Sequence, residues 1–338
     1  MKERLLGRTG LGISEIGFGC WAIGGGSYGK VRDEDSLEAL ETAWDSGVNF
    51  FDTADIYGEG HSEVLIGKFL KSKPRDKKIV ATKAGWDFYP ANAKPASSQK
   101  GCSSHLNHTG HKKNFDPAYI RFACEQSLRR LGVEAIDLYQ LHNPPLELIR
   151  EKEIVGVLEK LKKEGKIRCI GISVHTEAEA LTALEDSRVE SLQVIFNLLD
   201  QRMAKKVFPE ALEKGVGIVA REPLASGLLS GKYGPEHEFP KDDHRRRWVR
   251  EKREADWQKI QRIQKELGGE TSSLSQAALE FILAFEAVST VIPGSKTKAQ
   301  VVENVAASLK PSLDRETVSR WESLYANEEI FQKGLNPR

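Results

Sequence analysis

The chain lacks the features that mark membrane-spanning, secreted and nucleic-acid-binding proteins. No apolar run approaches the roughly twenty residues of a membrane-spanning helix, and the opening MKERLLGRTGLG has no apolar signal-peptide core. Only four cysteines are scattered over 338 residues, which argues for reduced thiols rather than a disulfide framework. The net charge of +1 gives no field that would attract nucleic acid or an anionic membrane. We therefore expect a cytoplasmic protein with no nucleic-acid or membrane partner.

The chain also lacks an interdomain linker, since no Pro/Ser-rich or low-complexity block interrupts it. Instead, short apolar segments alternate with amphipathic ones, which predicts strands and helices in turn. Eight strands are predicted, at 16–20, 49–52, 78–83, 136–142, 167–173, 192–196, 217–221 and 288–292, each followed by a helix. This count favours a closed (β/α)8 TIM barrel over an open sheet, as a single domain over residues 1–338.

Several additions to the barrel are expected. An N-terminal β-hairpin is predicted around Gly7–Gly12, and two long loops, 86–115 and 230–246, are predicted as insertions at the C-terminal face. Asp33 is expected to cap the first helix, while Asp116-Pro117 should open a helix that Gly132 ends. The predicted helices are 33–46, from about 62 onward, 116–131, 154–163, 177–185, 205–214, about 247–267, 274–285, 298–307 and a C-terminal helix at about 314–325.

Reactive side chains stand where three neighbouring strands end. In barrels of this type the active site lies at the C-terminal ends of the strands. The second strand ends at Asp52, the third at Lys83 and the fourth at His142, and Tyr57 follows the second strand on a loop. Any one of these residues alone would most simply be structural, but the four together at neighbouring strand ends indicate a site.

These residue types suggest acid–base chemistry at a carbonyl group. A tyrosine has an ordinary pKa of about 10, and a neighbouring ammonium such as Lys83 would lower it. Asp52 would hold Lys83 charged, and His142 would bind a substrate oxygen or relay a proton. Tyr57 would then protonate an alkoxide as hydride is added to a carbonyl. Because no side chain donates hydride, a nicotinamide cofactor is implied.

Segments along nearly the whole chain resemble the aldo-keto reductase family. The family's Asp, Tyr, Lys and His tetrad falls on Asp52, Tyr57, Lys83 and His142. The resemblance implies a (β/α)8 barrel that moves hydride between NADP(H), or NAD, and an aldehyde, ketone, sugar or polyol. It does not identify the substrate, the direction of reaction, or whether the protein is a monomer or a homo-oligomer. The matching segments are GFGCW at 17–21, FDTADIYGEGHSEVLIG at 51–67, ATKAG at 81–85, SLRRLGVEAIDLYQLHNP at 127–144, GKIRCIGIS at 165–173, QVIFN at 193–197, PLASGLLSGKY at 223–233 and IPGSKTKAQVVEN at 292–304.

The resemblance also implies cofactor-binding residues. Ser173 and Gln193 match the family's carboxamide binders, whereas Val174 stands where the family often has Asn. Arg221 stands where a Tyr or Trp commonly stacks on the nicotinamide, and its planar guanidinium can stack similarly. The other residues assigned to the cofactor are Cys20, Trp21 and Asp52, then Pro223, Leu224, Ser226, Leu228 and Lys232 over the pyrophosphate, and Gly294, Ser295, Lys296, Gln300, Glu303 and Asn304 at the adenosine phosphate.

Lys296 lies beside a predicted helix N-terminus, which suits an anion, and its pairing with a 2′-phosphate would favour NADP. Gln300 stands where the family often has Arg. The substrate pocket is expected to be lined by Trp21, Tyr57, Trp86 and His142. Arg245, Arg246 and Arg247 would either clamp the cofactor or form a solvated charged loop.

Two motifs suggest other chemistry and are set aside. Gly24, Gly26 and Gly29 spell the GxGxxG of a dinucleotide-binding turn, but that motif runs straight into a helix, and here the helix is expected only near Asp33. We predict a loop at the barrel mouth instead. A second segment spaces possible zinc ligands three residues apart, yet no strand or helix is evident to preorganise them, and no metal site is predicted there. Its candidate ligands are Cys102, His105, His108 and His111.

Two rival functions remain open. One is a Schiff-base aldolase with Lys83 as nucleophile, although an Asp52 partner would keep the amine protonated. The other is a regulatory or sensor subunit that holds NADP with little turnover, which an intact tetrad disfavours.

Overall fold

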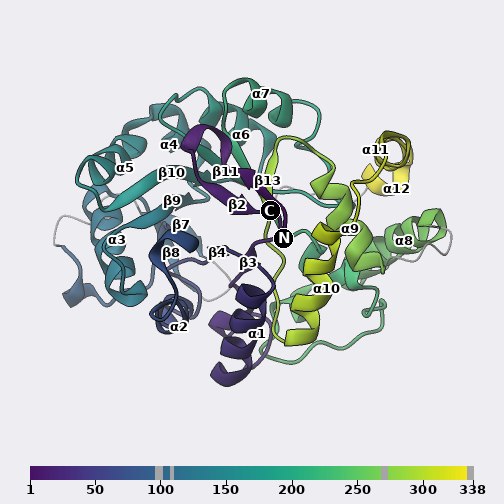
Figure 1. The fold of residues 1–338 in the computed structure, drawn as a ribbon, viewed down its shortest axis with the longest axis horizontal. Helices are drawn as coiled ribbons and strands as arrows, with labels where there is room; N and C mark the ends of the chain where they lie inside the picture. Colours follow the sequence, from purple (N-terminus) through teal and green to yellow (C-terminus); the bar gives the residue numbers. More distant parts are fainter. Residues whose placement is uncertain (96–101, 107–109, 268–272, 333–338) are drawn as a thin grey trace.

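An eight-stranded parallel sheet lies at the centre of the computed structural model, which describes residues 1–95, 102–106, 110–267 and 273–332 (Figure 1). Its strands follow one another in chain order. The last strand returns to the first, since Ile16 bridges Val291 in parallel and Gly19 bridges Gly294. The Gly17 N–H also donates to the Val291 carbonyl at 2.8 Å. The predicted (β/α)8 barrel is therefore confirmed.

The barrel strands are largely apolar segments buried on both faces, as expected for strands that helices cover. Every residue of the third, sixth and eighth barrel strands is buried. The strand bounds are β3 (Phe18–Gly19), β4 (Phe50–Asp52), β5 (Ile79–Ala84), β9 (Ile136–His142), β10 (Ile167–Ser173), β11 (Ser191–Ile195), β12 (Gly217–Arg221) and β13 (Val288–Val291).

Helices surround the sheet (Figure 1). Each predicted helix is present within a few residues, and the sequence pattern missed two short ones, α4 and α12. The α-helices are α1 (Asp33–Asp45), α2 (His61–Leu70), α3 (Pro117–Leu131), α4 (Leu146–Glu151), α5 (Glu153–Lys163), α6 (Glu177–Leu184), α7 (Val207–Glu213), α8 (Arg250–Leu267), α9 (Leu274–Leu283), α10 (Lys298–Leu309), α11 (Arg315–Asn327) and α12 (Glu329–Gln332). The 3-10 helices are η1 (Gly7–Thr9), η2 (Ala22–Gly24), η3 (Arg75–Lys77), η4 (Ala91–Ala93), η5 (Ala225–Ser230) and η6 (His244–Arg247).

The two helix caps predicted from sequence have different outcomes. The Asp116 carboxylate accepts the Ala118 N–H at 2.8 Å, and α3 ends at Gly132 with φ +65°, as expected. The prediction for Asp33 is wrong. It is the first residue of α1, and its carboxylate lies 2.8 Å from the His61 ring nitrogen instead.

The N-terminal hairpin closes one end of the barrel. Strands β1 (Glu3–Leu5) and β2 (Gly12–Ser14) pair antiparallel, as predicted. Leu6 and Ile13 are fully buried in a cluster with Phe50, Ile79 and Leu138 from the barrel strands. Because the hairpin fills the end where these strands begin, the opposite end, where the strands finish, is free to carry a site.

The predicted polar loop 86–115 contains a small antiparallel sheet, so that prediction is wrong. The sheet has the order β6 (Trp86–Asp87), β8 (Lys112–Asn114) and β7 (Cys102–Leu106). Its strands are short and polar, without the apolar alternation by which a strand is recognised in sequence. The predicted loop 230–246 begins at the last residue of η5, Ser230, and after it the next helical piece is η6, which starts at His244.

Candidate active site

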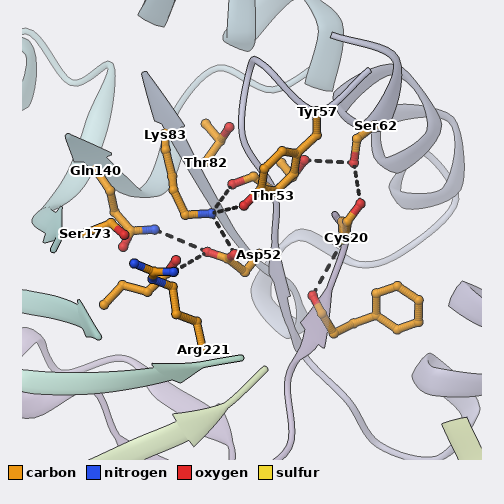
Figure 2. A network of polar contacts seen from close by, with 12 residues as sticks. Cys20, Asp52, Thr53, Tyr57, Ser62, Thr82, Lys83, Gln140, Ser173 and Arg221 are labelled. Atoms are coloured by element: carbon orange, nitrogen blue, oxygen red, sulfur yellow. Dashed lines mark hydrogen bonds and ion pairs between the residues drawn. The ribbon is translucent and has the colours of Figure 1, made fainter. Parts of the chain in front are cut away.

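The four candidate residues lie at the C-terminal end of the barrel. Lys83 contacts two of the other three, Asp52 and Tyr57 (Figure 2). Its ammonium donates to the Asp52 carboxylate at 2.7 Å and to the Thr53 carbonyl at 2.6 Å. The same nitrogen lies 3.5 Å from the Tyr57 hydroxyl. Lys83 is fully buried and Asp52 is 2% exposed. The ammonium therefore has three fixed partners, and its direction toward the tyrosine is set by the other two.

Two amides complete the surroundings of Asp52. Gln193 donates to its second carboxylate oxygen at 2.7 Å, and Gln140 donates to the same atom at 3.2 Å. Burial alone lowers the pKa of Lys83, but the Asp52 carboxylate and Tyr57 outweigh it, and the net pKa lies above the ordinary value. Lys83 is therefore a charged ammonium at neutral pH, held in an ion pair whose carboxylate is fully hydrogen-bonded.

Tyr57 differs from the sequence-based expectation in its acidity. Burial raises the pKa of its hydroxyl, and the lowering effect of Lys83 offsets only part of this rise, so the net pKa lies above the ordinary value. The expected net lowering is therefore wrong, because it considered the ammonium without the loss of solvent. At neutral pH the hydroxyl is protonated, which suits a group that donates a proton.

His142 presents a neutral ring to the same space. Its ring centroid lies 6.0 Å from that of Tyr57, at an interplanar angle of 85°. Burial lowers its pKa well below the ordinary value, and the nearby charges of Lys83 and Arg221 act in the same direction. Within the described part of the chain, its buried Nδ1 has no hydrogen-bond partner. A neutral imidazole here can bind a substrate oxygen, but it carries no positive charge.

A cavity of about 760 Å³ extends from these residues across the barrel mouth. It is lined by the four residues predicted for the substrate pocket, Trp21, Tyr57, Trp86 and His142. Among the residues predicted for the cofactor, Ser173, Leu228 and Ser295 do not line it. The predicted cofactor residues that do are Cys20, Trp21, Asp52, Gln193, Arg221, Pro223, Leu224, Ser226, Lys232, Gly294, Lys296, Gln300, Glu303 and Asn304.

The end of the cavity at Gly294–Asn304 fits an anionic group. It lies at the N-terminus of α10, where Thr297 caps the helix and free N–H groups favour anions. The Lys296 backbone N–H donates to the Gln300 side chain at 2.7 Å, and the Lys296 ammonium contacts the Tyr28 carbonyl. Burial lowers the pKa of Lys296, as does Arg245 nearby. A cavity of about 760 Å³ that is lined by Tyr57 and by the basic residues Lys296 and Arg245 fits a dinucleotide.

Two loops meet over this cavity, one that contains residues 24–29 and one that contains residues 243–245. The first contains the GxGxxG motif, and the helix that follows begins only at Asp33, as expected for a loop. Tyr28 of this loop forms an isolated antiparallel β-bridge with Asp243, and the His244 backbone N–H donates to the Ser27 carbonyl at 2.9 Å. Arg245 is buried and donates to the Asp243 carboxylate at 2.6 Å. Arg245 therefore fastens the loop rather than standing solvated.

Arg221 lines the cavity and is held by several neighbours. Its guanidinium lies 3.1 Å from the Glu222 carboxylate, 3.1 Å from the Val174 carbonyl and 3.0 Å from the His175 Nδ1. It also donates to the Asn143 side chain at 3.4 Å. These contacts fix the plane of the guanidinium.

Sequence reasoning missed several residues of the site. Gln140 and Asn143 were not singled out, nor were Tyr28 and Glu222, and no role was expected for His175. Tyr28, His175 and Glu222 line the cavity. Gln140 had a usable signal, because it is a buried amide of β9 two residues before His142. Asn143 adopts φ +57° directly after His142, a conformation that no sequence pattern announces.

The possible zinc segment is only partly described. Cys102 and His105 fall in β7, of which the backbone alone is described, and His108 lies outside the described residues. The His111 ring nitrogen is 3.0 Å from the Glu59 carboxylate. Over the residues that can be searched, there is no group of three or more metal-binding side chains. Among the residues that the structure describes, no helix is both long enough and apolar enough to cross a bilayer.

Comparison with known proteins extends over almost the whole chain. The model described as "Aldo/keto reductase family" matches residues 15–326. The chain is 32% identical over 303 residues to a D-threo-aldose 1-dehydrogenase of a Pseudomonas species, covering 88% of this chain and 89% of that protein. It is 31% identical over 318 residues to an NADH-specific methylglyoxal reductase of Escherichia coli K12, covering 91% and 93%.

Among solved structures, the fold is similar to that of an aldo-keto reductase from Bacillus halodurans in its holo form. The TM-score is 0.76 at 30% sequence identity, and the match covers 96% of each chain.

Proposed function

This chain belongs to the aldo/keto reductase family and is an oxidoreductase; we propose that it moves hydride between NADP(H) and the carbonyl or alcohol carbon of an aldehyde, ketone or sugar-like substrate. The observation that carries the proposal is the contact of the buried Lys83 ammonium with both Asp52 and Tyr57. It orients a protonated hydroxyl toward a large cavity, beside a neutral His142. When bound, the nicotinamide supplies the hydride that no side chain can give.

Each residue of the tetrad has a separate task. Tyr57 gives a proton to the substrate oxygen during reduction and takes it back during oxidation. Lys83 stabilises the phenolate left behind, and Asp52 keeps Lys83 charged and oriented. His142, as a neutral ring, binds the substrate oxygen and sets its direction toward Tyr57.

The same geometry argues against the rival functions. A Schiff base requires Lys83 as a free amine, but its pKa is raised by Asp52 and Tyr57 in spite of burial. A sensor subunit needs no proton donor at its cavity, whereas the Tyr57 hydroxyl and the Lys83 ammonium are arranged as a donor pair.

The substrate class is that of a small polar carbonyl compound or its alcohol. The two relatives named above act on an aldose and on methylglyoxal, as their names state. In this chain the cavity beside Tyr57 is bordered by Trp21 and Trp86 and by polar groups of Asn143, His175 and Glu222. This mixture of flat aromatic faces and hydrogen-bonding groups suits a hydroxylated substrate.

A cofactor-paired screen tests the proposal. NADPH and NADH are each combined with aldehydes and ketones, and NADP and NAD with sugars and polyols. We expect turnover with at least one pair. Tight NADPH binding without turnover on the whole panel would favour the sensor, and borohydride trapping of substrate on Lys83 would favour the aldolase. A location in the cytoplasm remains a prediction.

Lys296 should decide the preference for NADP. We expect Lys296→Ala to raise the KM for NADPH by about 10- to 100-fold, as for the loss of a charged hydrogen bond, while the KM for NADH stays within about twofold. Steady-state kinetics with both cofactors measure this. Lys298→Ala is the matched control, because Lys298 is exposed at the start of the same helix and does not line the cavity. Equal changes for the two cofactors would refute the pairing with a 2′-phosphate.

A further inference from the structure

The small sheet β6–β8–β7 contacts the active-site residues through one lysine. Lys113 lies in β8 directly opposite Trp86 of β6 in the antiparallel pair. Its ammonium stands 5.4 Å from the centroid of the Trp86 ring, a distance at which a cation is attracted to an aromatic face. The Trp86 ring in turn lies 6.4 Å from that of His142 at 88°. Lys113 therefore supports the wall of the cavity from behind.

The same ammonium also holds the peptide that follows His142. It donates to the Asn143 carbonyl at 2.5 Å. Asn143 has φ +57°, in the left-handed region that Asn adopts more readily than most residues with a side chain, and its own side chain accepts from Ser173 at 3.2 Å. A fixed anchor on its carbonyl helps to keep this turn, and hence the end of β9, in place.

The environment of Lys113 suits this task. In the part of the chain that the structure describes, no carboxylate lies within 4 Å of its ammonium, so a carbonyl and an aromatic face are its partners. The Trp86 backbone is fixed separately, since the Tyr119 hydroxyl donates to the Trp86 carbonyl at 2.6 Å. The ammonium is thus the group that acts on the Trp86 ring itself rather than on its backbone.

We propose that Lys113 is a positioning residue for the substrate: by binding the Trp86 ring and the Asn143 carbonyl at once, it sets the width of the cavity beside His142. This inference rests on the proposed function, because it assigns Trp86 and Asn143 to the substrate end of the cavity. The strands β6 and β8 are then determinants of substrate affinity through Trp86 and Lys113.

Lys113→Met tests the proposal, because methionine keeps an unbranched apolar side chain that reaches to Cε and removes the ammonium. We expect the KM for the carbonyl substrate to rise about tenfold, through the lost cation–aromatic and carbonyl contacts, with kcat and the NADPH affinity within about twofold. Lys113→Arg, which keeps a cation over the ring, should restore most of the affinity. Lys112→Met is the matched control, since Lys112 is an exposed lysine of the same strand on its other face.

Hydrogen exchange gives a readout that does not depend on turnover. Lys113→Met should increase deuterium uptake in peptides covering 84–89 and 142–146, and Lys112→Met should not. Unchanged exchange in both segments would overturn the proposal, and so would faster exchange with an unchanged KM. If the parent protein turns over no substrate on the panel, the proposed function fails, and exchange alone decides whether Lys113 positions these segments.

Discussion

Tyr57→Phe should reduce kcat by about 10²- to 10⁴-fold, the contribution of a positioned acid or base, while the dissociation constant of NADPH changes by less than about twofold. The variant removes one hydroxyl and leaves the rest of the network intact. Lys83 keeps its contacts with the Asp52 carboxylate at 2.7 Å and the Thr53 carbonyl at 2.6 Å. Because the cavity retains its shape, only the proton donor is lost. Single-turnover kinetics and a fluorescence titration of NADPH measure the two quantities separately.

The matched control for this variant is Tyr139→Phe. Tyr139 is a fully buried tyrosine of β9, whose hydroxyl is directed to the Ile120 carbonyl of α3 at 3.4 Å. Loss of that hydroxyl should leave kcat near the parent value. Near-normal turnover in Tyr57→Phe would show that another group supplies the proton, and the role given to Tyr57 would be wrong.

Lys83→Met should lower kcat in both directions by about 10²- to 10³-fold, as for the loss of a preorganised electrostatic group. It should also change the pH profile of alcohol oxidation. The pKa of Tyr57 is raised by burial and lowered by Lys83, so removal of the ammonium raises it further. Oxidation needs the deprotonated tyrosine, and its rate should therefore rise only at higher pH than in the parent protein. Rate measurements between about pH 7 and pH 11 span the ordinary tyrosine pKa of about 10.

Lys83→Met also leaves a buried Asp52 without its cation, which destabilises the fold. Lys78→Met is the matched control. Lys78 is 8% exposed, precedes the same strand at its other end, and donates to the Leu70 carbonyl at 2.5 Å. We expect it to lower the denaturation midpoint without changing the pH profile. A Lys83→Met protein that is folded and keeps the parent pH profile would contradict the proposed action of Lys83 on Tyr57.

Much of the barrel was predictable because its strands are apolar runs with clear ends. The ranges 136–142, 167–173 and 217–221 agree with β9, β10 and β12 to the residue. The small sheet on the insertion was not predictable. Its strand β8 reads Lys-Lys-Asn, and pairing with β6 rather than side-chain alternation makes it a strand. Such pairing depends on a distant segment, which a local pattern does not contain.

The site was predictable in its members but not in its electrostatics. Residue types at strand ends identified Asp52, Lys83 and His142 because the C-terminal ends of neighbouring strands meet in any such barrel. The acidity of Tyr57 depends instead on how completely the surrounding residues exclude water, and sequence does not give burial at a loop position. The hydrogen bond from Gln140 to Asp52 spans 88 positions of the chain, and only the fold shows it.

Transfer of deuterium from NADPH that carries deuterium at both C4 positions of the nicotinamide tests the central claim most directly. The parent protein is incubated with labelled NADPH and a carbonyl substrate, and the product alcohol is examined by mass spectrometry and NMR. We predict one deuterium per NADPH consumed, located on the former carbonyl carbon. Product without deuterium on that carbon, or no consumption of NADPH or NADH with any substrate on the panel, would contradict hydride transfer at this site.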